Sequence, residues 1–380
     1  MDSARGTTSR IIRQAFVLVL ACRLAACAAV PAPASPRPDP AADRLFHADP
    51  RWLGGDAAIS VPLSKDRILW LFGDSFVDPA APYDRREAAF AHNTVAVQQG
   101  ADPRRAAMRF AWGTASGAPA SFFPDDGADW FWPGDGTMLP GGKLAIFLHR
   151  VTATEAGPPL GFRTAGYALV LVDNPADDPS RWRQRRIDGP ALPFDALPGA
   201  AILRDGAEFV VLATRSGDGQ AGLLVRWPAV ALANGDLGGG LWWAGEARGW
   251  LAAAAIGPAG PAMVIDAAGA ESSLHRDACG RIVHVTSRGF GATDIVLRLA
   301  RDAQGPWSPP ETLARPADSA GKGAFVYAGR AHPEQAGPGL ALTLTYVANS
   351  FRPEDLLTPA GQSTLYWPRM IRAVTPLCPN

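Results

Sequence analysis

Beyond residue 45, the apolar residues of this chain occur in short runs, and none of the runs has the period of an amphipathic helix. Each run is about six to nine residues long and is bounded by Gly, Pro, Asp or Asn, which is the pattern of strands joined by tight turns. The 40 glycines and 35 prolines of the chain are consistent with many such turns. The pattern predicts an all-β protein.

The expected strands fall into five groups at a spacing of roughly 60 residues, which is typical of a β-propeller. The first strands of the groups are "AISVPL", "GDGTML", "GAAILRD", "SSLHRD" and "VYAGRAHPE". Four groups hold four strands and the last holds three, so we expect the stretch "LFHADPRWL" to supply the missing strand and close a ring. The prediction is a single-domain, five-bladed β-propeller of four-stranded antiparallel blades over residues 45–380. A two-sheet sandwich is the alternative, because strand patterns do not fix closure.

The first 44 residues have the character of an export segment. Three arginines precede the apolar run at 15–21, and "LAAC" follows and ends at Cys27. A basic start, a short apolar stretch and small residues predict a signal peptide over residues 1–27, with Cys27 as the lipidated residue of a lipoprotein. Cleavage at an Ala-x-Ala site and free secretion is the alternative. Residues 28–44 are rich in Pro and Ala and predict a tether. We therefore expect an exported protein, anchored by lipid in the periplasm or at the cell surface.

Charge and cysteine content exclude some partners. Lys and Arg total 36, as do Asp and Glu, so no basic field exists to hold nucleic acid. Membrane contact is expected through the lipid anchor alone, and a monomer is expected. Cys279 and Cys378 are predicted either to pair, as an oxidising compartment allows, or to remain free thiols. Their spacing is not that of metal ligands or a thiol nucleophile, and no cofactor is predicted.

Carboxylates mark the starts of the expected inner strands, which converge on one face of a propeller. These positions hold Asp56, Asp135 and Glu271, with His332 and Glu334 in the last group. Asp74, in "ILWLFGDSFVD", ends the second strand of the first group. The start of one strand and the end of its antiparallel neighbour lie at the same sheet edge, so Asp56 and Asp74 should share one rim. Two close carboxylates push their pKa values apart, as glycosidic cleavage requires.

This placement predicts Asp56 as base or nucleophile and Asp74 as general acid. Other side chains are predicted to bind substrate or tune these acids: Asp135, Glu271, His92, Asn93, Trp130, Trp132 and His332. The two tryptophans lie in a loop before Asp135, and a flat aromatic ring beside carboxylates suits a sugar. The structural alternatives are that the aspartates cap turns and that the histidines are satisfied in the interior.

Segments such as "RILWLFGDSFVD", "WFWPGDGTMLPGGKLAIFLHRV", "SSLHRDACGRIVHVTSRG" and "LYWPRMIRAV" resemble, in order and over most of the chain after residue 45, the five-bladed propellers of domain of unknown function 4185 and its relatives. Some members of that group are endo-D-arabinanases with two aspartates on the first blade. The resemblance implies that Asp56 and Asp74 are the matching pair and that the substrate contains arabinofuranose.

The expected function is therefore that of an exported glycoside hydrolase acting on a polysaccharide. The alternative is a carbohydrate-binding or scaffolding propeller of the cell envelope without catalysis. A third reading is metal-assisted hydrolysis, because acids with His332 at a ring centre could hold Ca²⁺.

Overall fold

The computed structural model describes residues 35–155, 161–216, 220–289, 291–320, 323–335, 341–376 and 378. The predicted signal peptide over residues 1–27, with the lipidation site Cys27, lies outside these residues. Among them, no helix is both long enough and apolar enough to span a membrane.

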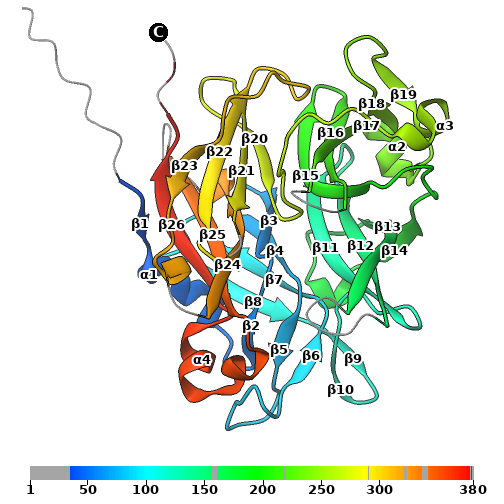
Figure 1. Cartoon of the computed structure of the whole chain (residues 1–380). Helices are drawn as coiled ribbons and strands as arrows, with labels where there is room; N and C mark the ends of the chain where they lie inside the picture. Colours follow the sequence, from blue (N-terminus) through cyan, green and yellow to red (C-terminus); the bar gives the residue numbers. More distant parts are fainter. Residues whose placement is uncertain are drawn as a thin grey trace, which may run out of the picture. The chain divides into compact units, whose positions relative to one another are not determined.

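The described chain is all-β, as predicted, and five antiparallel sheets of four or five strands follow one another along it (Figure 1). The first sheet contains β3 (Ile59–Ser64), β4 (Arg67–Phe72), β7 (Thr94–Gln99) and β8 (Ala107–Ala111). The second contains β11 (Asp129–Met138), β12 (Leu144–Ala153), β13 (Phe162–Val172) and β14 (Gln184–Asp188). The third contains β15 (Leu197–Asp205), β16 (Glu208–Thr214), β17 (Gly222–Pro228), β18 (Leu241–Trp243) and β19 (Trp250–Ala252). The fourth contains β20 (Ser273–Arg276), β21 (Ile282–Arg288), β22 (Asp294–Ala300) and β23 (Glu311–Ala314). The fifth contains β24 (Ala324–Ala331), β25 (Ala341–Ser350), β26 (Pro368–Val374) and β1 (Arg37–Pro38).

Smaller elements connect these sheets. Two short sheets are formed by β2 (Trp52–Gly55), β5 (Ser75–Val77) and β6 (Ala89–Ala91), and by β9 (Gly113–Ala115) and β10 (Ala118–Ala120). The α-helices are single turns or little more: α1 (Pro40–Asp43), α2 (Ala229–Asn234), α3 (Ala253–Ile256) and α4 (Pro359–Thr364). The 3-10 helices are η1 (Arg44–His47), η2 (Pro179–Arg181), η3 (Gly257–Ala259), η4 (Ala317–Ala320), η5 (Pro333–Gln335) and η6 (Pro353–Leu357).

The fourth strand of the last sheet comes from a different segment than predicted. β1 pairs with β26, with Arg37 opposite Arg372, whereas the predicted stretch at 45–53 contributes η1 and β2, and β2 pairs with β5. The reason is local: Asp39 is buried and accepts hydrogen bonds from Arg104 and from Arg372 on β26, which holds the preceding residues against the edge of that strand. Residues 35–44 of the predicted tether therefore belong to the folded part.

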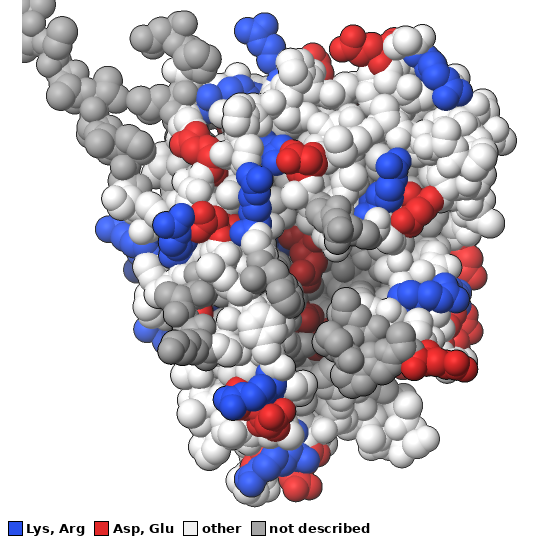
Figure 2. All heavy atoms as spheres, in the orientation of Figure 1, with Lys and Arg blue, Asp and Glu red and all other residues white. Residues whose placement is uncertain are grey.

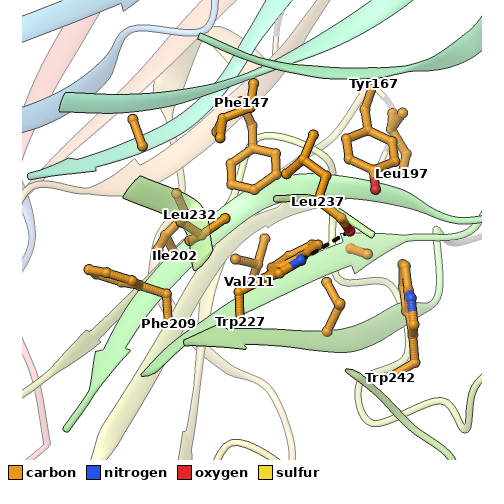
Figure 3. Packing of buried hydrophobic residues seen from close by; sticks show 14 of the residues in the cluster. Phe147, Tyr167, Leu197, Ile202, Phe209, Val211, Trp227, Leu232, Leu237 and Trp242 are labelled. Carbon is orange, nitrogen blue, oxygen red and sulfur yellow. Dashed lines mark hydrogen bonds between the residues drawn. The ribbon is translucent and has the colours of Figure 1, made fainter. Parts of the chain in front are cut away.

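The core consists of apolar layers between consecutive sheets. Figure 3 shows the layer between the second and third sheets, where Phe147 of β12 lies 5.8 Å from Trp227 of β17 (ring centroids) and the Trp227 indole donates to the carbonyl of Leu237. On β4, Leu69 and Leu71 enter the layer with the second sheet, while Trp70 enters the layer that also contains Met370 of β26. The strand is thus buried on both faces, which explains its unbroken apolar run.

The last sheet also contacts the first. Met370 of β26 packs with Trp70, and Ser60 of β3 forms a hydrogen bond with His332, which follows β24. Among the described residues, hydrogen bonding does not join the large sheets into one closed sheet, so the sheets are held together by side chains.

Candidate active site

Asp56 and Asp74 lie side by side, which confirms the adjacency expected from antiparallel strands. The backbone N–H of Asp56 donates to the carbonyl of Asp74 at 3.2 Å, and the N–H of Gly73 donates to the carbonyl of Asp56 at 3.1 Å. A Cβ atom at residue 73 would lie 2.3 Å from Oδ1 of Asp56. Gly73 therefore leaves the space that the Asp56 carboxylate occupies.

Two tyrosines hold the Asp56 carboxylate, Tyr327 of β24 and Tyr366, which lies just before β26. Tyr327 and Tyr366 donate their hydroxyls to Oδ2 of Asp56 at 2.8 and 3.0 Å. Burial raises the pKa of Asp56 well above its usual range, and the charges of Asp74 and Glu271 raise it further, while the two hydroxyls oppose this rise. Asp56 therefore favours its protonated form.

Strained backbone surrounds these residues. Ala57 and Ala58, directly after Asp56, have φ angles of 64° and 51°, Ala328, directly after Tyr327, has 54°, and Tyr366 has 64°. These angles lie in the left-handed region, which residues other than glycine rarely adopt. Such strain clusters at functional sites, where the surrounding structure enforces it.

The Asp74 carboxylate is held by side chains. Its Oδ1 accepts a hydrogen bond from the indole N–H of Trp132 at 2.8 Å and lies 3.3 Å from Nδ1 of His92. The His92 ring in turn stacks on Trp130, with 4.8 Å between ring centroids. Within the described chain, no backbone N–H donates to the Asp56 or Asp74 carboxylate. This arrangement differs from the turn-capping alternative.

Glu271 is the third acid of this cluster. It lies just before β20 and lines a pocket of about 580 Å³ together with Tyr327 and Arg288. Burial raises the pKa of Glu271 to about 7, the positive charge of Arg330 opposes the rise, and the charge of Asp74 adds to it. Figure 2 shows acidic side chains recessed in a hollow near the middle of one face.

Asp135 lies deeper than predicted. It sits inside β11, at a bulge between Pro133 and Gly136, and does not open the strand. Its two carboxylate oxygens accept hydrogen bonds from the backbone N–H groups of Gly136 and of Ile202 on β15, each at 2.9 Å. Asp135 therefore joins the second and third sheets, which differs from the predicted role in sugar binding.

Asn93 and His332 are also interior residues, with no side-chain exposure, and this differs from their predicted contact with substrate. The Asn93 amide donates to the carbonyls of Phe123 and Phe131 and accepts from the N–H of Phe123, which fixes two chain segments. The His332 ring is held between hydroxyls of Ser60 and Thr345. Both residues are satisfied polar groups of the core.

Arg330 of β24 supplies a buried positive charge beneath the acid cluster. It is 2% exposed, and its Nη2 lies 3.5 Å from Oδ1 of Asp135. Its charge lowers the pKa values of Asp135, Glu271 and Glu334, each of which burial raises. In the sequence, Arg330 is one arginine among many, and no sequence pattern singles out Tyr327 or Tyr366 as a site residue.

Among the described residues, no group of three or more His, Cys, Asp or Glu side chains is arranged to hold a metal ion. The predicted cysteine alternatives are resolved: Cys279 and Cys378 form a disulfide.

The comparisons with solved structures concern the fold. A protein from Bacteroides ovatus ATCC 8483, described as a "putative hydrolase", matches with a TM-score of 0.69 at 16% identity, over 89% of this chain and 90% of that one. An exo-β-1,3-galactanase from Phanerochaete chrysosporium matches with a TM-score of 0.44 at 12% identity, over 84% of this chain and 60% of that one. A xylan β-1,4-xylosidase from Bacillus halodurans C-125 matches with a TM-score of 0.46 at 11% identity, over 86% and 54%.

No curated protein sequence matches the chain. A family model does match, and it corrects the resemblance to domain of unknown function 4185, which is wrong: the model covering residues 39–375 is DUF5005. The short apolar runs and turn signals that suggested the other family indicate strands and turns and do not distinguish one all-β family from another. The chain therefore belongs to the family described as a domain of unknown function, DUF5005.

Proposed function

We propose that this protein is a glycoside hydrolase that cleaves a polysaccharide at the cluster of Asp56, Asp74 and Glu271. The observation that carries the proposal is the pairing of two adjacent carboxylates in different settings. Oδ2 of Asp56 accepts two tyrosine hydroxyls and its pKa is raised, whereas Asp74 is 21% exposed and held by side-chain N–H groups. Two such acids are what glycosidic cleavage uses.

In this proposal Asp56 donates the proton, which reverses the roles expected from the sequence. The protonated Asp56 gives its proton to the glycosidic oxygen as the bond to the leaving sugar breaks. Asp74 either removes a proton from the attacking water or attacks the anomeric carbon itself. The donors Trp132 and His92 stabilise its negative charge. Glu271 keeps the pKa of Asp56 high through its own charge.

The scaffold of this proposal is a five-bladed propeller, each large sheet being one blade. Three features support the closed ring: the apolar layers between consecutive sheets, the packing of Met370 on the first sheet, and the hydrogen bond from Ser60 to His332. The pairing of β1 with β26 would then complete the last blade with an N-terminal strand.

Export is part of the proposal. Disulfides persist in oxidising compartments and are rare in the cytosol, so the Cys279–Cys378 bond supports a location outside the cytosol. The lipid anchor at Cys27 remains a prediction from the sequence.

The test is a screen of the purified protein against arabinan, galactan, xylan and other polysaccharides, with release of reducing ends as the readout. Asp56→Asn and Asp74→Asn should each lower kcat by at least about 100-fold, the range for loss of a general acid or base. Asp205→Asn is the matched control, because Asp205 is an exposed aspartate paired with Arg276 away from the cluster. Hydrolysis that is unchanged in both active-site variants would overturn the proposal. Sugar binding without hydrolysis by the unaltered protein would favour the non-catalytic alternative.

A further inference from the structure

A continuous row of aromatic rings runs beside the acid cluster. Consecutive ring centroids lie 5.2, 5.8, 4.8, 6.2 and 4.8 Å apart. The rings come from β5, from β6 and the residue that follows it, and from β11 and β13 of the second large sheet. We call this set the aromatic row, and its members in order are Phe76, Phe90, His92, Trp130, Trp132 and Phe162.

The aromatic row contacts Asp74 directly and reaches Asp56 through Tyr366. His92 and Trp132 approach Oδ1 of Asp74 directly. Phe76 packs against Tyr366, with 5.7 Å between ring centroids, and Tyr366 donates to Asp56. The row therefore passes both acids: its ends are Phe76, beside Tyr366, and Phe162, beyond Trp132, and Phe90 lies between Phe76 and His92.

The rings of the row stay partly exposed although the protein buries other aromatic rings completely. Trp52, Trp70 and Trp227 have no exposed surface, whereas Phe90 is 49% exposed and the His92 side chain is 28% exposed. The other members are also partly exposed. Apolar surface left open in a contiguous strip marks a binding site.

We propose that the aromatic row binds consecutive units of a neutral polysaccharide chain, so that the protein recognises several sugars on either side of the acids. The acid cluster in contact with the row disfavours an anionic polysaccharide, and the open faces of aromatic rings suit the apolar C–H faces of uncharged sugars. Phe90, which is 49% exposed, and Phe162, at the end of the row, form no hydrogen bond with an aspartate and are the positions for sugars further from the acids. The sugars at the acids themselves belong to the proposed hydrolase site, on which this inference rests.

The test measures binding and cleavage as functions of chain length. Binding of a ladder from disaccharide to octasaccharide, made from the polysaccharides of the screen, is followed by calorimetry with Asp56→Asn, whose carboxylate is not in the row. Affinity should rise with length, and Phe90→Ala introduced into this background should lower the affinity for the longest chains by about three- to tenfold, as loss of one ring contact implies. The affinity of this combined variant for the disaccharide should equal that of Asp56→Asn alone. Met263→Ala is the control, because Met263 is also an exposed apolar residue, 58% exposed, outside the row.

The outcomes separate this inference from the proposed function. A length-dependent loss in Phe90→Ala without hydrolysis by the unaltered protein supports the row and overturns the hydrolase. Hydrolysis that requires Asp56, with equal affinity for short and long chains or with no effect of Phe90→Ala, overturns the row alone. Failure of every neutral polysaccharide to bind also overturns it.

Discussion

The hydroxyl of Tyr327 donates to Oδ2 of Asp56 at 2.8 Å, although 271 residues separate the two along the chain. The contact links the fifth sheet to the segment that leads into the first sheet. Because the hydroxyl stabilises the ionised carboxylate, it opposes the burial that raises the Asp56 pKa. The proton affinity of Asp56 is therefore a balance between burial and neighbouring charges on one side and two tyrosine donors on the other.

Removing one tyrosine donor should raise the pKa of Asp56. In Tyr327→Phe the pKa of Asp56 rises further, so Asp56 keeps its proton to a higher pH, and the alkaline limb of the kcat/KM profile should move to higher pH. Tyr83→Phe, at an exposed tyrosine outside the cluster, should leave the profile unchanged. An alkaline limb that moves to lower pH would contradict Asp56 as the proton donor.

Neutralising Glu271 should move the same limb in the opposite direction. The charge of Glu271 raises the pKa of Asp56, so Glu271→Gln lowers it, and Asp56 loses its proton at a lower pH. We expect the alkaline limb of kcat/KM to move to lower pH, with Glu246→Gln, an exposed glutamate, as the control. If Tyr327→Phe and Glu271→Gln shift the alkaline limb equally and in the same direction, the limb reflects the titration of a group other than Asp56.

Glu271 should also make folding stability depend on pH. Its folded-state pKa of about 7 lies above the ordinary 4.5, so the folded protein holds the proton more tightly than the unfolded chain. The stabilisation is complete below about pH 4.5 and is lost as pH rises through about 7, at a cost of about 2–3 kcal/mol. Thermal unfolding should therefore show Glu271→Gln to be more stable than the unaltered protein at pH 8 and similar at pH 4.5. Equal stability of the two proteins at both pH values would contradict the raised pKa of Glu271.

The strands of the five sheets and the adjacency of Asp56 and Asp74 could be predicted from the sequence, because both follow from local rules. The run "ILWLF" is apolar at every position because residues 68–72 are buried on both faces, and an antiparallel pair puts Asp56 and Asp74 at one edge. Glu271 was also placed correctly, just before the first strand of the fourth sheet.

The remaining site residues depend on contacts that no local pattern reveals. Tyr366 reaches Asp56 across 310 residues, and its left-handed backbone is set by the surrounding structure. Asn93 and His332 show the reverse problem: a polar residue that completes core hydrogen bonds is indistinguishable in sequence from one that binds a ligand. The two-residue strand β1 lacks an apolar run, since Asp39 rather than hydrophobic burial anchors it.

Asp39 should therefore contribute more to the free energy of unfolding than the short strand β1 beside it suggests. Burial alone would raise its pKa, but hydrogen bonds from Arg372 and Arg104 hold the pKa below the usual range. Asp39 is 3% exposed, and Asp39→Ala removes the carboxylate that accepts hydrogen bonds from both arginines. The loss should lower the free energy of unfolding by about 2–4 kcal/mol. Urea denaturation measures the loss, with the exposed Asp66→Ala as control. A loss no larger than that of the control would show that β1 contributes little to the fold.

The disulfide should stabilise the same end of the fold. Cys279 lies between β20 and β21 in the fourth sheet, and Cys378 follows β26, so the bond closes a loop spanning 99 positions and ties the C-terminal segment to the fourth sheet. A crosslink over such a span reduces the freedom of the unfolded chain, and its removal typically lowers the free energy of unfolding by about 2–5 kcal/mol. Cys279→Ser combined with Cys378→Ser should show this loss in urea denaturation, and dithiothreitol should reproduce it in the unaltered protein. The double variant itself should not respond to dithiothreitol, which makes it the control for other effects of the reductant. The bond does not stabilise the native fold if the unaltered protein unfolds at the same urea concentration with and without dithiothreitol and the double variant also unfolds at that concentration.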